Sequence, residues 1–358
     1  MDPSLLNDLM DFIAADEGND DAFNALALRL FAHQFQHDLP LQRVCQQRAR
    51  TPRTVRHWRE IPAVPIQAFK DLTLSAQAIE QCERVFMTSG TTRADVRGRH
   101  FHPHLQVYDL SMRLNFERQV MRGAGPMRVM VFFPNEDLMP HSSLAHYLAL
   151  ARADFGTADS DHYIDAQGLR LSAALEDLQQ ACERGQAVLL LGASYSLVHL
   201  MDALQAQGLR FRLPPGSRIM DTGGFKGQSR ELSPTDFYQG LASTFGVYAS
   251  DCQNMYGMTE LSTQFYDAGQ EKQPVVKRGP HWIKTRVLDP LSGVEMPAGE
   301  IGVLAHTDLG NFNSVLTLLT EDLGHTQDDG FVLLGRAQGA QAKGCSLAVE
   351  HFLQAAQA

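Results

Sequence analysis

The sequence predicts an α/β protein in which parallel-rich sheets are flanked by helices and a smaller β-rich subdomain is attached. The first observation is that, between residues 128 and 245, apolar segments of strand length alternate with amphipathic segments of about 10 to 15 residues, a pattern typical of parallel βαβ units. The second is that short strand-like segments separated by turns replace this alternation after residue 275. The length of 358 residues is enough for a large core and two or three domains.

Residues 1–80 are expected to form a helical N-terminal segment packed on the core. Apolar side chains recur at helical spacing in two stretches, with Leu5 and Leu9 in the first and Phe23 and Leu30 in the second. The spacing predicts two amphipathic helices whose apolar faces are buried.

The periodicity of apolar residues also divides the rest of the chain into three predicted segments. Residues 81–275 are the predicted α/β core, residues 276–335 the β-rich subdomain, and residues 336–358 a short C-terminal remnant. Helices are expected at residues 104–122, 142–151, 171–184, 195–207 and 233–245. Strands are expected at residues 128–133, 187–191 and 218–222 in the core, and at residues 285–288, 302–306, 315–320 and 331–334 in the subdomain.

Composition limits the class of protein. A formal net charge of −10 argues against a nucleic-acid partner, and we interpret the basic cluster from Arg43 to Arg59 as a solvated helix face with its flanking loops. No apolar run reaches the roughly 18 residues of a membrane span, and no secretory signal precedes the first helix. The five cysteines are scattered, without a C-x-x-C pair, so we expect a cytoplasmic protein without disulfides.

Residues 86–92 read Phe-Met-Thr-Ser-Gly-Thr-Thr and are the most informative segment of the chain. An apolar approach ends in five small residues, four of which carry hydroxyl groups. We expect a buried strand to end here in a tight loop whose backbone N–H groups and hydroxyls bind phosphate. A Ser/Thr-rich surface turn is the alternative interpretation of this segment when it is taken alone.

Further motifs follow in order along the chain. Asp221–Gly227 carries paired glycines, which permit a close backbone approach to a flat ligand. Asn254–Glu260 offers an aromatic ring, a hydroxyl and a carboxylate within a few residues. Strand ends later in the chain carry two carboxylates and a guanidinium, which belong to Glu321, Asp322 and Arg336.

The order of these motifs resembles that of the adenylate-forming superfamily, which contains acyl- and aryl-CoA ligases, luciferases and adenylation domains. The resemblance covers about residues 85 to 345 and includes a T-S-G-T-T loop, a G-G turn, a Y-G-x-T-E motif, a strand-end carboxylate and a G-R hinge. Within the superfamily, the chain is most similar to the acyl-protein synthetases, the long-chain-fatty-acid–luciferin-component ligases of the LuxE type. Phenylacetate-CoA ligases are the nearest sister group.

Departures from the superfamily pattern narrow the resemblance. Arg93 stands where the loop usually continues with glycine, and no Pro-Lys follows it. Arg97 and Arg99 either replace the missing loop lysine or form surface salt bridges. Only a short segment follows Arg336, so the large C-terminal domain and its catalytic lysine are expected to be absent, with Lys343 as a partial substitute. These features favour an acyl-protein synthetase over a CoA ligase.

The resemblance implies ATP- and Mg²⁺-dependent activation of a carboxylic acid, expected to be a fatty acid, to an acyl-adenylate, with acyl transfer to a cysteine or a partner protein. The residues implied to wrap the β- and γ-phosphates are Thr88, Ser89, Gly90, Thr91 and Thr92. Those implied for the adenine are Gly223, Gly224 and Tyr256, with Asp322 on the ribose. Thr259 is implied to bind the α-phosphate, Glu260 to hold Mg²⁺, and Arg336 to lie near the ribose or phosphates.

Three further residues have two interpretations each. Cys345 stands near the C-terminus, where acyl-protein synthetases carry the acyl-accepting cysteine; Lys343 would lower its thiol pKa and the preceding glycine would leave the sulfur accessible. It is otherwise simply a small residue. His141 contacts the acyl substrate, or its segment only caps a helix at Ser142. His100 faces phosphate, or faces solvent.

Two alternative functions remain open at this point. One is an aryl- or acyl-CoA ligase that uses a separately encoded C-terminal domain. The other is a non-catalytic subunit of an acyl-reductase-type complex. The sequence does not identify the acid, the oligomeric state or the final acyl acceptor, which could be the protein's own cysteine, CoA or a reductase-like partner protein.

Overall fold

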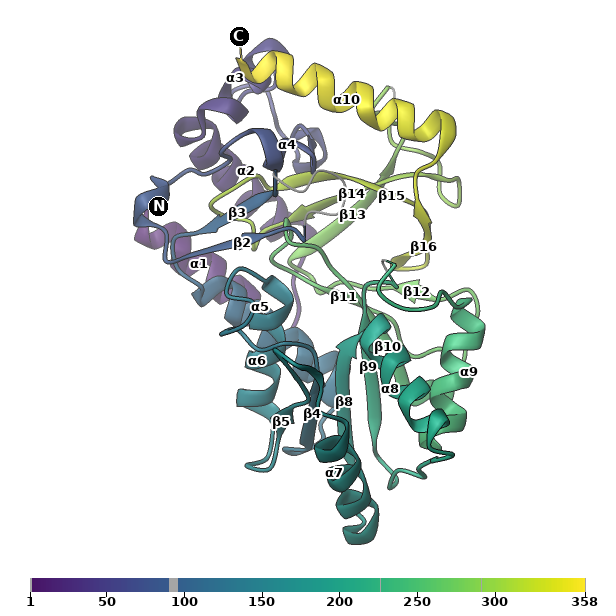
Figure 1. Cartoon of the computed structure of the whole chain (residues 1–358). Coiled ribbons are helices and arrows are strands. Elements are labelled where there is room, and N and C mark those ends of the chain that lie inside the picture. The colour runs from purple at the N-terminus through teal and green to yellow at the C-terminus, as the bar shows by residue number, and fades with distance from the viewer. Residues whose placement is uncertain (1, 90–95, 226, 291, 358) are drawn as a thin grey trace. The chain divides into compact units, whose positions relative to one another are not determined.

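The computed structural model describes residues 2–89, 96–225, 227–290 and 292–357, without the side chains of Ala340, Gln341 and Lys343. The chain divides into two compact units, which Figure 1 shows with the labels used below. The first unit comprises Met1–Met112, Met258–Thr263 and Val276–Ala358, and the second comprises Arg113–Gly257 and Gln264–Val275. The segments expected at residues 1–80, 276–335 and 336–358 thus fall in one unit, while the expected core at residues 81–275 contributes to both.

The second unit is built on a six-stranded sheet in the order β11-β10-β9-β8-β4-β5. Its strands are parallel except for β11, which runs antiparallel to β10. The strands are β4 (Arg128–Phe132), β5 (Asp161–His162), β8 (Val188–Ala193), β9 (Arg218–Thr222), β10 (Cys252–Tyr256) and β11 (Phe265–Tyr266). The helices are α6 (Ser143–Phe155), α7 (Leu171–Arg184), α8 (Ser194–Ala206) and α9 (Pro234–Phe245), and a small hairpin pairs β6 (Ile164–Asp165) with β7 (Gly168–Leu169). The predicted parallel βαβ units are confirmed.

Local sequence explains these elements. Strands β4 and β8 are buried along their whole length, which is why they read as nearly continuous apolar runs. The N-cap residue of helix α9 is Ser233, whose hydroxyl accepts a hydrogen bond from the Asp236 N–H. The C-cap residue of the helix is Gly246. Gly246 has φ 66°, a left-handed conformation that glycine adopts without strain.

The first unit contains the β-rich part. Its six-stranded sheet has the order β12-β16-β15-β14-β13, and β1 adds to it by pairing in parallel with β15. The strands are β1 (Val64–Pro65), β12 (Val276–Lys277), β13 (Ile283–Leu288), β14 (Gly302–Asp308), β15 (Thr317–Gln327) and β16 (Gly330–Arg336). The β-rich region predicted after residue 275 is therefore present, and β1 joins the N-terminal segment to it.

Helices of the first unit include α1 (Pro3–Ala14), α2 (Asp20–His37), α3 (Leu39–Gln47), α4 (Ala68–Asp71) and α10 (Gly339–Gln357). The C-terminal end of α10 lies beside α3 (Figure 1). Arg43 Nη1 donates a hydrogen bond to the Ala356 carbonyl at 3.0 Å, and Gln47 Nε2 donates one to the Ala355 carbonyl at 3.3 Å. The segment predicted as a C-terminal remnant is thus a long helix that is held to the N-terminal segment.

A separate two-stranded hairpin, β2 (Arg84–Met87) and β3 (Arg99–His102), lies in the first unit. After it, α5 (Gln106–Phe116) runs from the first unit into the second and continues in a π-helical turn over Glu117–Met121. In the described part of the chain, no helix has the length and hydropathy needed to cross a membrane.

Candidate active site

The T-S-G-T-T loop leaves the hairpin at the end of β2. The Thr88 N–H donates to the Gly98 carbonyl at 3.0 Å, and the Gly98 N–H donates to Thr88 Oγ1 at 2.9 Å. Thr88 therefore closes the base of the loop. Ser89 is exposed, while the predicted phosphate ligands Gly90, Thr91 and Thr92 lie outside the described residues.

Strand β2 differs from the prediction in its burial. We expected a buried strand, but only Phe86 in β2 is buried, and the strand pairs with β3 alone. The physical reason is that a two-stranded hairpin has room for apolar packing on one face only.

Gly98 brings the hairpin against the carboxylate of Glu260. A Cβ atom added at Gly98 would lie 3.1 Å from Thr88 Cγ2 and 3.3 Å from Glu260 Oε1, so a side chain there would have to displace one of them. The phosphate loop and the Y-G-x-T-E motif, which are distant in sequence, thus meet at one glycine. This is the contact that the resemblance requires if both motifs bind the same phosphate chain.

Glu260 is 6% exposed, and burial raises the pKa of its carboxyl group to about 7. Lys70 and Arg336 act in the opposite direction and lower this pKa, while the Glu321 carboxylate raises it. A buried carboxylate with so little compensation is a site at which a cation would be stabilised.

His100 connects the hairpin to the same motif. Its Nδ1 donates to the Thr259 carbonyl at 3.0 Å, and its Nε2 accepts from the Ser314 hydroxyl at 3.2 Å. The side chain is 1% exposed, and burial lowers its pKa to about 4. The two predicted orientations, toward phosphate or toward solvent, are both wrong, because His100 is a neutral, buried residue that positions the backbone next to Glu260.

Asp322 and Arg336 are partners across β15 and β16. Arg336 Nε lies 4.0 Å from Asp322 Oδ1, and Arg336 Nη1 lies 3.9 Å from Glu321 Oε2. The Arg336 side chain is 72% exposed, whereas Glu321 is held by a hydrogen bond from Gln67 Nε2 at 2.8 Å. The end of β16 therefore presents a solvent-facing guanidinium beside Asp322, which lies within β15 and not at its end as expected, because β15 continues to Gln327.

Cys345 is placed differently from the prediction. It is 5% exposed on α10 and packs against Leu288, Val303, Ala305 and Leu319 of the sheet. Burial raises its thiol pKa, and the carboxylates of Glu321 and Asp322 raise it further. The expected accessible and acidified thiol is contradicted, because α10 lays this face on the sheet. The side chain of Lys343, which we expected to lower this pKa, lies outside the described residues.

In the second unit, the G-G turn follows β9. Gly223 has φ 76°, which favours glycine, and the position of a Cβ atom at Gly224 is open space. Behind the turn, buried Asp221 accepts hydrogen bonds from Ser194 Oγ at 2.6 Å, from the Tyr238 hydroxyl at 2.8 Å and from Asn254 Nδ2 at 3.0 Å. This network anchors the strand end from which the glycines project.

Tyr256 ends β10 and is 8% exposed, with its ring centroid 5.9 Å from that of Phe265. Its ring therefore offers little surface to a base in this conformation. His141 is exposed, and the next residue, Ser142, caps α6 by accepting from the Ala145 N–H at 3.2 Å. The capping interpretation of this segment is thus observed, while a substrate contact of His141 stays a prediction.

Two loop arginines were candidates for phosphate counter-charges. Arg97 is exposed, and the Arg99 guanidinium lies 5.8 Å from the centre of the Phe101 ring. Within the described ranges, no three His, Cys, Asp or Glu residues gather as metal ligands. A magnesium ion held by Glu260 would therefore depend mainly on phosphate oxygens and water, as is usual for Mg²⁺ in nucleotide sites.

Sequence reasoning did not single out Gly98, and it did not predict the contacts of His100 or the anchoring role of Asp221. Gly98 and His100 carry no local pattern, because their partners at Thr259 and Glu260 lie far along the chain. Asp221 did carry a signal, since it is an acidic residue inside a strand that ends at a glycine pair.

Comparison with known proteins shows which family this sequence matches. A family model described as acyl-protein synthetase, LuxE, matches residues 4–354. A long-chain-fatty-acid–luciferin-component ligase from Vibrio harveyi is 22% identical over 307 residues, which cover 83% of this chain and 79% of the relative. Its counterpart from Aliivibrio fischeri is 21% identical over 308 residues, which cover 82% of this chain and 79% of the relative.

Solved structures share the fold. 2-Hydroxyisobutyryl-CoA ligase in the postadenylation state with 2-HIB-AMP has a TM-score of 0.65 at 15% identity, covering 88% of this chain and 67% of that chain. ATP-bound MatB from Rhodopseudomonas palustris has a TM-score of 0.52 at 17% identity, covering 73% of this chain and 49% of that chain, so the match spans about half of MatB. These similarities confirm the predicted adenylate-forming fold. Together with the match over residues 4–354, they establish that the chain belongs to the acyl-protein synthetase (LuxE) family.

Proposed function

We propose that this protein activates a carboxylic acid with ATP to an acyl-adenylate and then transfers the acyl group to Cys345. The observation that carries the proposal is the meeting of Thr88, Gly98 and Glu260 at the base of the phosphate loop. Membership of the acyl-protein synthetase family supports it, and the names of the two curated relatives favour a long-chain fatty acid as the substrate.

In the first unit, the proposed roles follow from the chemistry of each group. Thr88 contributes a hydroxyl whose proton can be donated to a phosphate oxygen while its oxygen accepts from Gly98. Glu260 would hold Mg²⁺, whose charge, when the ion is bound, neutralises phosphate oxygens during attack on the α-phosphorus. Asp322 would accept from the ribose hydroxyls, with Arg336 beside it.

Other assignments rest on the family resemblance. For the second unit, they are Gly223 and Gly224 beside the adenine, Tyr256 against its face, and His141 near the acyl substrate. The remaining ones are Ser89, Gly90, Thr91 and Thr92 on the β- and γ-phosphates and Thr259 on the α-phosphate.

The two chemical steps balance without a further reactant. In the first, the acid's carboxylate attacks the α-phosphorus and pyrophosphate leaves. In the second, the Cys345 sulfur attacks the acyl carbonyl, the carbonyl–oxygen bond to AMP breaks, and the thiol proton passes to solvent. Because Cys345 is 5% exposed and its pKa is raised, we expect α10 to shift before the second step.

ATP–pyrophosphate exchange over a panel of carboxylic acids of graded chain length tests the first step. We expect exchange with at least one fatty acid, and none when the acid is left out. A folded protein that binds ATP but exchanges with no acid would contradict the proposal. AMP release that requires CoA would instead identify a CoA ligase.

A further inference from the structure

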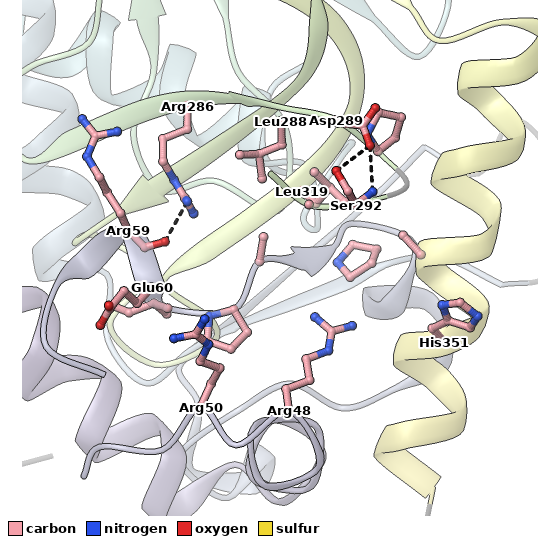
Figure 2. Close-up of a pocket in the computed structure, with 17 residues that line it drawn as sticks. Arg48, Arg50, Arg59, Glu60, Arg286, Leu288, Asp289, Ser292, Leu319 and His351 are labelled. Atoms are coloured by element: carbon pink, nitrogen blue, oxygen red, sulfur yellow. Dashed lines mark hydrogen bonds between the residues drawn. The ribbon is translucent and has the colours of Figure 1, made fainter. Parts of the chain in front are cut away.

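A cavity of the first unit is rich in arginine. It has a volume of about 440 Å³ and lies among the segment after α3, the β1 segment, β13 and α10 (Figure 2). The charged residues among the described lining are Arg48, Arg50, Arg59, Arg286, Glu60 and Asp289. The four arginines outnumber the two carboxylates of the lining, in a chain whose formal net charge is −10.

Both carboxylates of the lining already have partners. Glu60 accepts from the backbone N–H groups of Arg56 at 2.6 Å and His57 at 3.2 Å. Asp289 Oδ1 accepts from the N–H of Ser292 at 2.7 Å and from its hydroxyl at 2.8 Å. These hydrogen bonds hold both acids on backbone and hydroxyl donors, and neither acid forms an ion pair within 4.0 Å with Arg48, Arg50 or Arg286.

Of the arginines, Arg59 pairs with Glu295 at 2.5 Å. Across the described residues, Arg48, Arg50 and Arg286 form no ion pair within 4.0 Å. In Figure 2, Arg48 and Arg50 extend into the cavity from one side and Arg286 from the opposite side. Three guanidinium groups that form no ion pair with a described residue thus face one space, and Glu60 and Glu295 act on Arg50 and Arg286 only from beyond 4.0 Å.

Arg286 is the unusual member, because it is only 7% exposed. Its Nη1 donates to the Arg59 carbonyl at 2.7 Å, and its guanidinium lies 5.6 Å from the centre of the Trp58 ring. No acceptor in the described part of the chain reaches its Nε, and burial lowers its pKa. A buried guanidinium without a carboxylate partner is costly unless an anion completes its environment.

The apolar wall of the cavity is shared with Cys345. Leu288 and Leu319 line the cavity and also pack in the same cluster as the Cys345 side chain, as do the smaller side chains of Ala63 and Ala348. The cavity and the thiol therefore share these apolar side chains. One of them, Ala348, belongs to α10 itself.

We propose that this cavity binds the phosphate group of a small organic phosphate, with Arg48, Arg50 and Arg286 around the anion and the less polar part of the ligand against Leu288 and Leu319. Three guanidinium groups without an ion pair to a described residue match a phosphate monoester, which carries about −1.5 to −2 at neutral pH, better than a single carboxylate. Arginine forks also suit phosphate oxygens, which accept two parallel hydrogen bonds from one guanidinium. The site is distinct from the nucleotide residues of the proposed activity.

Titration calorimetry on the full chain tests the site, with inorganic phosphate, 4′-phosphopantetheine, adenosine 3′,5′-bisphosphate and a fatty acid as separate probes. We expect the phosphate-bearing probes to bind and the tightest of them to identify the source of the phosphate. The variants Arg286→Gln and Arg50→Gln should each weaken binding about tenfold, because each removes a charge-assisted hydrogen bond.

Arg53→Gln is the matched control, because it makes the same charge change in the same basic segment, at an exposed residue outside the cavity. It should change affinity less than twofold. Thr88→Val should also leave this binding unchanged, which separates the site from the phosphate loop. Equal binding by wild type, Arg286→Gln and Arg50→Gln would overturn the proposal. A result in which the fatty acid binds and none of the phosphate-bearing probes does would also overturn it. Arg50 is exposed, so its variant remains informative if Arg286→Gln fails to fold.

Thiol labelling tests the placement of the ligand against the Cys345 wall without using enzyme activity. The protein would be treated with a maleimide, and modification of each of its five cysteines followed by peptide mass spectrometry. We expect a saturating phosphate probe to slow modification of Cys345 at least threefold in wild type and not in Arg286→Gln. A rate that the probe leaves unchanged would overturn this placement.

Discussion

The first unit contains two proposed anion sites, and they are built from opposite chemistry. At the hairpin, a hydroxyl, backbone N–H groups and one buried carboxylate converge around Thr88 and Glu260. In the cavity beside α10, guanidinium groups supply the positive charge directly. The hairpin site would accept phosphate together with a cation, whereas the arginine cavity would accept phosphate alone. If both proposals hold, the protein has one place for chemistry on phosphate and a separate place for binding it.

The largest expected effect is that of Glu260→Gln, which should impair the hairpin site and leave the arginine cavity intact. Removing the carboxylate should reduce ATP–pyrophosphate exchange about 100-fold or more, because phosphate charge would lose its metal-dependent stabilisation. The exposed Glu300→Gln variant is the matched control and should exchange like wild type. Phosphate binding in the arginine cavity should not change in either variant. Full exchange activity in Glu260→Gln would show that the carboxylate has no part in the reaction.

Thr88→Val tests the hydroxyl at the base of the loop. Valine keeps the branched shape, but the Gly98 N–H loses its acceptor at 2.9 Å and the phosphate loses a donor. We expect exchange to fall roughly tenfold, mainly through a higher KM for ATP. Thr88→Ser should recover most of the activity, and a serine variant as impaired as valine would argue against the hydroxyl's role.

A pH-dependent prediction concerns α3, at whose end the arginine cavity begins. Burial raises the pKa of its N-cap residue Asp38 to about 7, although the Leu41 and Ser75 N–H groups oppose this shift. Because the folded-state pKa is above the unfolded value, this contribution to stability is present at low pH and is lost as pH rises from about 4 to about 7.

Asp38→Asn should remove that pH dependence and raise the free energy of unfolding above pH 7 by on the order of 1 kcal/mol, because asparagine keeps the cap acceptor without the buried charge. Denaturant titrations of both proteins at several pH values would measure this. The prediction would be contradicted if the free energy of unfolding changed with pH in the same way in wild type and in Asp38→Asn.

The smallest expected effect is that of Arg50→Gln on acid activation. If the two sites are independent, ATP–pyrophosphate exchange should stay within twofold of wild type while phosphate binding in the cavity weakens. A large loss of exchange in a folded variant would mean that the sites are one functional unit.

The comparison also shows what could be predicted from the sequence. The hairpin site was found because T-S-G-T-T and Y-G-x-T-E are contiguous motifs, although the bridging role of His100 depends on tertiary contacts with Thr259 and Ser314. The arginine cavity was interpreted as a solvated basic face. Arg48 and Arg50 are indeed exposed, but their partner Arg286 belongs to a strand far along the chain.

The fold shows the same division between local and non-local information. Strands β4 and β8 were predicted because buried parallel strands are apolar almost throughout. The two-residue strand β1 exists only through its pairing with β15, which no local pattern encodes. The burial of Cys345 was missed for the same reason, since it depends on where α10 packs.

The central claim is acid activation followed by transfer to Cys345, and intact-protein mass spectrometry tests it most directly. Wild type, incubated with ATP, Mg²⁺ and the acid that supports exchange, should gain the mass of one acyl group, in a linkage that hydroxylamine cleaves. Cys345→Ser should show the same exchange rate and no hydroxylamine-sensitive adduct. A hydroxylamine-sensitive adduct that persists in Cys345→Ser, or a wild type that exchanges but never becomes acylated, would contradict the account.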